Sequence, residues 1–281
     1  MAHRLRVGYL GPEGTFTHEA LMASPVAGSF ELRPMPTVYD TIMGVEQRCV
    51  DRALVPIENS LEGSVNATLD TLAMEVAGVA ILGETVHPIR HCLIARRSVE
   101  LEDIRVVVSH PQATAQCARF LRARLAGAAV TSAASTADAV RAVAESEGAA
   151  AALGTRLSAE IYGCVVLEDG VEDVAGNQTR FVWLGPPDQE PVGEGAWKTS
   201  IVFWGAGDDT PGWLVRCLSA LADREVNLTM IESRPRRLAL GHYMFFADLQ
   251  GHAEEPRLAE ALGALRGQTE ALRVLGSYPA A

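Results

Sequence analysis

The sequence predicts an α/β protein of two domains, and three observations carry this prediction. Short apolar runs alternate with helical patterns through the first two-thirds of the 281-residue chain. The stretch 187–197 is then rich in Pro, Gly and acidic residues, which favour neither helix nor strand. The remaining residues follow the order strand, helix, strand, strand, helix, strand. We therefore expect a first domain at 1–186, a linker at 187–197 and a second domain at 198–281.

The strands expected in the first domain are short apolar runs bounded by turn residues. They lie at 6–10, 30–34, 52–56, 104–109, 128–131, 149–153 and 180–184. Helical spacing of apolar residues separates several of these runs, for example at Leu69, Leu72 and Val76. Such alternation is typical of largely parallel sheets with helices packed on their faces.

The stretch 79–97, VAILGETVHPIRHCLIARR, interrupts this alternation because it contains no helical pattern. A long extended segment of this kind is explained by a crossing between two lobes, and we expect the chain to cross again near 164–180. A ligand would then bind in the cleft between the lobes, where strand ends and helix N-termini meet.

The second domain has the pattern of a ferredoxin-like α+β fold. Its strands are expected at 198–204, 227–233, 243–249 and 272–277, and its helices at 211–224 and 256–266. The first helix places Leu214, Cys217 and Leu221 on one face, which indicates that this face is buried. Domains of this shape commonly pair through sheet edges or helices, so a homo-oligomer is expected.

Charge and composition exclude several classes of partner. The net charge of −11 argues against a nucleic-acid backbone or an anionic membrane, but local amides and an Arg can still bind a small anion. No apolar run suggests a secretory signal or a membrane span. Five widely spaced cysteines without a CxxC pair indicate reduced thiols in a cytoplasmic protein. The absence of HExxH and of clustered His and Cys predicts no metal.

Four polar clusters follow or precede the expected strands: GPEGTFT (11–17), PIENSLEGSV (56–65), SHPQATAQC (109–117) and GNQTRF (176–181). Ligands of α/β proteins bind at strand ends, so together these clusters indicate a polar cleft for a small anionic ligand. Arg180 is the best candidate to bind a carboxylate through both guanidinium nitrogens, and Thr179 offers a hydroxyl donor.

Each cluster also has a purely structural explanation. Thr15 fits the N-cap of a helix, and Ser109 with Gln112 fits a capping box. A β-turn around Gly176 and Asn177 would account for the last cluster. One such cluster is ordinary, whereas four in a two-lobed pattern favour a binding cleft.

In this order the clusters resemble the prephenate dehydratase family, and NLTMIESRP (227–235) and YMFFADLQGH (243–252) resemble its C-terminal ACT regulatory domain. The resemblance implies a two-lobed catalytic domain like that of periplasmic binding proteins. It also implies conversion of prephenate to phenylpyruvate, water and carbon dioxide in L-phenylalanine biosynthesis, without a cofactor. The site residues that it implies are Thr179, Asn59 and Gln116 for catalysis, and Thr15, Ser60, Ser109, Arg180, Glu58 and His110 for substrate binding.

Loss of the ring carboxylate and the hydroxyl makes the prephenate ring aromatic, so positioning and electrostatics suffice for catalysis. We expect Thr179 to donate a hydrogen bond to the leaving hydroxyl, while Arg180 and backbone amides near Thr15 anchor the pyruvyl carboxylate. L-phenylalanine is expected to bind between two protomers of a homodimer or homotetramer. The effector residues implied are Pro211, Gly212, Trp213, Leu214, Glu232, Ser233, Arg234 and Pro235.

Two alternatives stay open at the level of sequence. Arogenate dehydratase is a close rival, because arogenate has an amine where prephenate has a keto group. An acidic residue that meets this ammonium group would favour it. The other alternative is a non-catalytic sensor of amino acids or keto acids that uses the same cleft and ACT domain.

Overall fold

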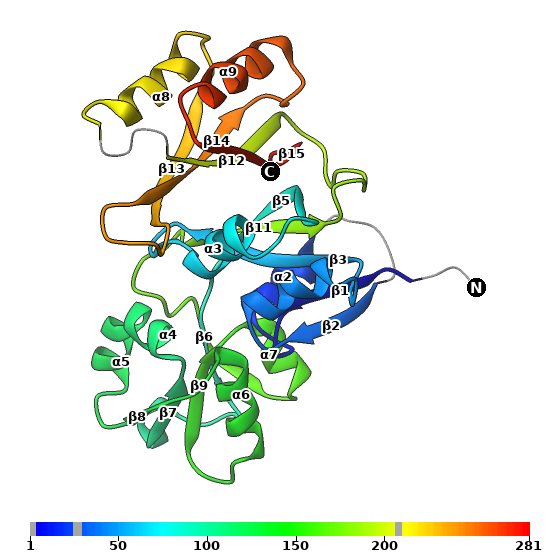
Figure 1. Ribbon diagram of the computed structural model, residues 1–281. Coiled ribbons are helices and arrows are strands. Elements are labelled where there is room, and N and C mark those ends of the chain that lie inside the picture. The colour runs from blue at the N-terminus through cyan, green and yellow to red at the C-terminus, as the bar shows by residue number, and fades with distance from the viewer. Residues whose placement is uncertain (1–3, 25–29, 206–209) are drawn as a thin grey trace.

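The computed structural model describes residues 4–24, 30–205 and 210–281. Its three sheets form three tiers in Figure 1, two lobes of the first domain below and the C-terminal domain above. We call the tier that holds the first described residues the first lobe and the lowest tier the second lobe. The predicted fold class, a two-lobed α/β domain followed by an ACT-like α+β domain, is confirmed.

The first lobe is a mixed sheet in the order β2-β1-β3-β11-β5, and the short β4 pairs with β3. Strands β1, β2 and β3 run parallel to one another, whereas β11 is antiparallel to both of its neighbours. The elements are β1 (Arg6–Leu10), α1 (Phe16–Ala23), β2 (Glu31–Met35), α2 (Val38–Glu46), β3 (Arg52–Asn59), β4 (Gly63–Ser64), α3 (Asn66–Met74), β5 (Ala80–Pro88) and β11 (Gln178–Gly185).

The second lobe is a mixed sheet in the order β10-β6-β9-β7-β8. The chain enters it between β5 and β6 and returns to the first lobe between β10 and β11. The elements are β6 (Cys92–Ala95), η1 (Leu101–Asp103), β7 (Val106–Ser109), α4 (Pro111–Gln116), α5 (Ala118–Arg124), β8 (Ala129–Ser132), α6 (Thr136–Glu145), β9 (Ala150–Gly154), α7 (Arg156–Ile161) and β10 (Val165–Asp169).

The C-terminal domain is an antiparallel sheet in the order β13-β14-β12-β15 with two helices on one face. Figure 1 shows α8 and α9 on the side away from the lobes. The elements are β12 (Trp197–Trp204), α8 (Trp213–Ala222), β13 (Leu228–Pro235), β14 (Tyr243–Gln250), α9 (Pro256–Arg266) and β15 (Ala271–Pro279).

Local chemistry explains where several helices begin. Thr15, Thr37, Ser135 and Thr155 each accept a hydrogen bond from the amide three residues on, and so cap α1, α2, α6 and α7. Helix α8 begins two residues later than expected because Gly212, at φ +80°, lies in the left-handed region.

The helix-free face of the C-terminal sheet packs against the first lobe. Phe246 and Tyr278 of this sheet share one core with Leu72 and Ile81 of the first lobe. The strands approach closely, because a methyl group added at Gly276 would collide with the carbonyl oxygen of Ile81. The C-terminal domain thus covers one side of the first lobe, and the opposite side faces the second lobe.

Candidate functional site

A cavity of about 410 Å³ lies between the two lobes. Its wall combines the ends of β1 and β3 and the start of β11 with the first turns of α1, α4 and α6. Five residues expected in the site line it: Thr15, Asn59, His110, Gln116 and Thr179. Its described lining contains no Asp, Glu, Lys or Arg.

Asn59 and Thr179 form the centre of the polar wall. They are register partners on β3 and β11, so the sheet itself holds them side by side. Asn59 Oδ1 accepts from the backbone amides of Leu61 and Glu62, both at 3.0 Å, which fixes the orientation of its amide. Asn59 Nδ2 therefore donates to Thr179 Oγ1 at 2.9 Å. Since a hydroxyl also carries one hydrogen of its own, Thr179 keeps that hydrogen for a ligand.

The hydrogen-bond network continues from Asn59 into the second lobe. Asn59 Nδ2 also donates to Asn177 Oδ1 at 2.8 Å, and Asn177 Nδ2 lies 3.5 Å from Gln116 Oε1. Gln116 Nε2 donates to the carboxylate of Glu62 at 3.1 Å, which fixes the orientation of this amide as well. Asn59 Nδ2 and one N–H of Gln116 Nε2 thus donate to protein atoms, and both side chains position their neighbours.

His91 belongs to the site and is absent from the sequence prediction. It lines the cavity, is 2% exposed, and its Nε2 lies 3.0 Å from Gln116 Oε1. Burial lowers the pKa of His91, although the hydrogen bond to Gln116 and the charge of Glu172 oppose this effect. The sequence feature that could have identified His91 is its position in the crossing between β5 and β6, because such a crossing borders the cleft.

Thr15 occupies the wall as a helix cap. Its hydroxyl donates to the Leu10 carbonyl at 2.9 Å and accepts from the His18 amide at 3.4 Å. The hydroxyl is therefore used within the protein, in the helix-capping role that the sequence also allowed for Thr15. The next two residues, Phe16 and Thr17, also line the cavity, at the end of α1 where backbone N–H groups favour negative charge.

Two expected substrate contacts, Ser60 and Ser109, lie outside the cavity lining and support it from within the protein. Ser60 donates to Asn177 Oδ1 at 3.3 Å and accepts from the Gln178 amide at 3.0 Å, so it supports the network from behind. Ser109 is fully buried in β7, and the capping box with Gln112 is wrong. His110 is the N-cap of α4 instead, and its Nδ1 accepts from the Gln112 amide at 3.3 Å.

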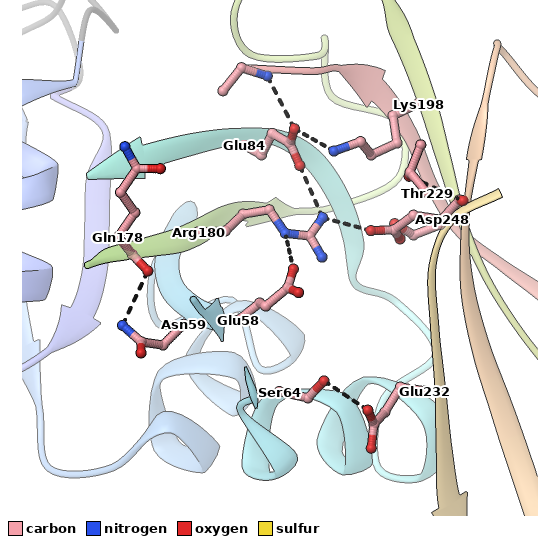
Figure 2. Close-up of polar contacts among 12 residues, drawn as sticks. Glu58, Asn59, Ser64, Glu84, Gln178, Arg180, Lys198, Thr229, Glu232 and Asp248 are labelled. Carbon is pink, nitrogen blue, oxygen red and sulfur yellow. Dashed lines mark hydrogen bonds and ion pairs between the residues drawn. The ribbon is translucent and has the colours of Figure 1, made fainter. Parts of the chain in front are cut away.

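Arg180, which was expected to anchor a carboxylate in the cleft, does not line the cavity. Successive side chains of a strand point to opposite faces, so Thr179 faces the cavity and Arg180 faces the C-terminal domain. Figure 2 shows its guanidinium between Glu58, Glu84 and Asp248. Its Nε lies 3.1 Å from Glu58, and its Nη1 lies 3.1 Å from Glu84 and 2.7 Å from Asp248. Glu58 shares this side of the sheet and likewise does not line the cavity.

This cluster of charges joins the C-terminal domain to the first lobe. Lys198 Nζ binds Glu84 at 2.6 Å, and Ser200 Oγ donates to Asp248 at 2.5 Å. Burial alone would lower the pKa of Arg180, but nearby negative groups, led by Asp248, outweigh it and raise that pKa. Arg180 is therefore a permanent cation held between the domains.

The expected effector residues separate into two groups. Gly212, Trp213 and Leu214 line a second cavity of about 250 Å³ beside Tyr243 and Phe245. The other five expected effector residues do not line this cavity. Pro211 precedes α8, and the remaining four lie in β13: Glu232, Ser233, Arg234 and Pro235.

Two of the remaining effector residues contact the first lobe. The Arg234 guanidinium binds Asp70 of α3 through Nε at 3.0 Å and Nη2 at 2.9 Å. Glu232 accepts from the Ser64 hydroxyl at 3.2 Å (Figure 2). Burial would raise the pKa of Asp70, and the guanidinium groups of Arg234 and Arg237 outweigh it and lower that pKa. Glu232 and Arg234 are thus held at the interface between the domains.

Together, the two lobes around an uncharged cavity and the ACT-like domain define a small-molecule-binding protein with an attached regulatory domain. The family model of prephenate dehydratase matches residues 7–189, and that of the ACT domain matches residues 200–267. The chain belongs to the prephenate dehydratase family and carries a C-terminal ACT domain. Its class is therefore that of the carbon–oxygen lyases.

Individual relatives resemble the chain over nearly its whole length, two of them named prephenate dehydratase and one described differently. A prephenate dehydratase of Mycobacterium bovis is 38% identical over 98% of this chain and 87% of the relative. The crystal structure of prephenate dehydratase in complex with L-Phe from Arthrobacter aurescens is 39% identical, with a TM-score of 0.89 over 98% of this chain and 90% of that chain. A structure described as a novel type of quorum-quenching acylase is 30% identical, with a TM-score of 0.84 over 98% of each chain.

Proposed function

We propose that the cavity between the lobes converts prephenate to phenylpyruvate, water and carbon dioxide, with Thr179 as the hydrogen-bond donor to the leaving hydroxyl. The observation that carries this proposal is the bond from Asn59 Nδ2 to Thr179 Oγ1, which leaves the threonine hydrogen free. A threonine hydroxyl does not transfer a full proton early in the reaction. It stabilises the negative charge that develops on the departing oxygen.

Other parts of the wall suit the remaining groups of prephenate. The first turns of α1 and α6 present backbone amides at the cavity, which favours a carboxylate at that end. Apolar side chains of Phe16, Ile89 and Phe181 form another part of the wall. A less polar surface favours loss of the ring carboxylate, because charge becomes dispersed as the C–C bond breaks.

The lining also favours prephenate over arogenate. Arogenate carries an ammonium group in place of the keto oxygen, and such a group is best met by a carboxylate. The described residues that line the cavity include none. Acylase chemistry has less support, since the cavity histidines bond to Gln116 and to a backbone amide rather than to a hydroxyl nucleophile.

The test is turnover by the purified protein. Prephenate and arogenate are supplied in parallel, and phenylpyruvate and phenylalanine are quantified. Formation of phenylpyruvate with little phenylalanine is the expected result. Preferential use of arogenate would overturn the substrate assignment. Tight binding of prephenate without turnover would support the sensor alternative instead.

L-phenylalanine is the proposed effector, because it is bound in the Arthrobacter aurescens relative. The cavity beside Trp213 and Phe245 offers an aromatic surface for it. The exposed edge strand β13, with Ile231 at 42% exposure, supports pairing of two ACT domains into a homodimer or homotetramer. We also propose the domain limits 1–186 and 198–281, since β11 ends at Gly185 and β12 begins at Trp197.

L-phenylalanine is expected to change the rate of phenylpyruvate formation or the oligomer size. Val215 is the residue to change, because it lines the same cavity and is 65% exposed, so Val215→Asp should fold. The carboxylate would repel that of the amino acid and weaken the response at least about tenfold. Val130→Asp in the second lobe is the matched control, with Val130 at 49% exposure. An unchanged L-phenylalanine response in Val215→Asp would exclude this cavity.

A cytoplasmic location is proposed as well. All five cysteines are free thiols, which fits a reducing compartment. Among the described residues, no helix combines the length and the apolar character that crossing a membrane requires.

A further inference from the structure

The cavity poses a problem of charge for a ligand with two carboxylates. Among the described residues that line it, none is a Lys or an Arg, and Arg180 is turned toward the C-terminal domain. Bringing carboxylates out of water without a positive partner is costly. Helix N-termini contribute only partial charges. The side chains of the described lining that can acquire a full positive charge are His91 and His110.

His91 has the geometry of an unused proton acceptor. Gln116 Nε2 is committed to the Glu62 carboxylate, so the atom that Gln116 turns toward His91 is its oxygen, 3.0 Å from Nε2. Nε2 must therefore carry a hydrogen and donate it. Nδ1 is then the free position, and it is buried without a partner in the described part of the chain.

Few charged groups surround this imidazole within its own lobe. Its chain neighbour Arg90 is exposed, and Glu172 accepts a hydrogen bond from the His91 backbone amide at 2.9 Å. Glu62 is reached only through Gln116. Burial lowers the pKa of His91 in the free protein, so the ring is neutral near pH 7, and a bound carboxylate would raise that pKa again.

The groups across the cavity are engaged elsewhere. From α1, Phe16 meets the imidazole edge to face, at 5.1 Å between ring centroids. His18 of that helix accepts from the Gly14 amide, and Glu19 binds His87 at 3.1 Å. His110 uses its Nδ1 to cap α4. Of the two histidines in the described lining, His91 is therefore the one whose proton-accepting nitrogen has no partner.

We propose that His91 takes up a proton at Nδ1 when the substrate binds and holds one of its carboxylates as an imidazolium. This inference rests on the proposed function, since it takes a dianionic substrate as given. His91 would then be the substrate-binding cation that the sequence assigned to Arg180. Proton uptake on binding is its distinctive consequence, because a preformed cation would take up none.

The direct test is calorimetric titration of prephenate into the slow variant Thr179→Ala at pH 8, in two buffers of different ionisation enthalpy. Uptake of about one proton per site is expected, because a neutral imidazole becomes charged in the complex. The double variant with His91→Gln keeps a hydrogen-bond donor toward Gln116 but lacks Nδ1. Proton uptake on binding prephenate should vanish in it. His110→Asn keeps the cap of α4 and should retain uptake. Binding without proton uptake, or equal uptake without His91, would overturn the inference.

A second readout needs no slow variant. In the wild type, kcat/KM for prephenate should fall about tenfold per pH unit above pH 7, because only the protonated free form binds productively. His91→Gln should lose about tenfold to 100-fold in kcat/KM at pH 6.5 and give a flat profile above pH 7. A falling profile that persists in His91→Gln would contradict the inference. Absence of phenylpyruvate at every pH would instead refute the proposed function.

Discussion

Thr179→Ala is expected to lower kcat for phenylpyruvate formation about 100- to 1000-fold, with a much smaller change in KM. The hydroxyl of Thr179 acts on the leaving group, whose negative charge exists only in the transition state. Removing it costs little in the ground-state complex, in which the departing oxygen is still a neutral hydroxyl. Steady-state rates and single turnovers with prephenate measure both parameters.

Thr179→Ser is the matched control, because it keeps the hydroxyl that Asn59 Nδ2 holds at 2.9 Å. It should stay within about tenfold of the wild type, since the lost methyl group changes positioning but removes no donor. Thr179→Val, which keeps the shape and loses the hydroxyl, should behave like Thr179→Ala. Near-normal turnover in Thr179→Ala would remove this residue from the mechanism.

Arg180→Met is expected to lower the free energy of unfolding by about 3–5 kcal/mol, the range found when one partner of a buried ion pair is removed. Its side chain is 11% exposed and faces Glu84 and Asp248, at 3% and 2% exposure. Their carboxylates would be left buried, and Lys198 reaches only Glu84. Denaturant unfolding at pH 7 measures the loss.

Arg141→Met is the control for the loss of an ordinary ion pair. Arg141 is 52% exposed and binds Asp138 on the same helix, so its replacement should cost less than about 1 kcal/mol. Replacing Asp248 by Asn in the Arg180→Met background should recover part of the stability, since an unpaired buried charge is removed. A stable Arg180→Met protein with a greatly raised KM would restore Arg180 to substrate binding.

Much of the fold could be predicted from the sequence because local patterns of apolar residues determine where most helices and strands form. Apolar runs and helical spacing identify the alternating elements, and the order in residues 198–281 matches β12 to β15 with α8 and α9. Residues 111–124 form two helices in the structure, α4 and α5. Cys117, at φ −114° and ψ 18°, ends α4 and precedes α5, a local backbone departure that apolar spacing does not reveal.

The site was harder to predict because strand ends do not say which way a side chain faces. Thr179 and Arg180 are neighbours, yet the pleat of β11 sends one to the cavity and the other to the C-terminal domain. Choosing between them requires knowing what covers each face of the sheet. Ser109 was misplaced for a similar reason, since it ends β7 with its side chain inside the lobe.

His91 was missed because a single histidine in an extended segment has no motif. Its importance arises from contacts with residues distant in the sequence, above all Gln116, 25 positions away. The uncharged lining of the cavity is equally invisible in a sequence with 24 Lys and Arg residues. Both features depend on how the two lobes close around one space.

The central claim is that Thr179 performs the chemistry while Arg180, one residue later, joins the domains. Single-turnover formation of phenylpyruvate by Thr179→Ala and Arg180→Met, compared at a temperature where both are folded, tests it most directly. Thr179→Ala should be slower than the wild type by about 100- to 1000-fold, and Arg180→Met should stay within about tenfold. The reverse ranking, with fast Thr179→Ala and slow Arg180→Met, would contradict the claim.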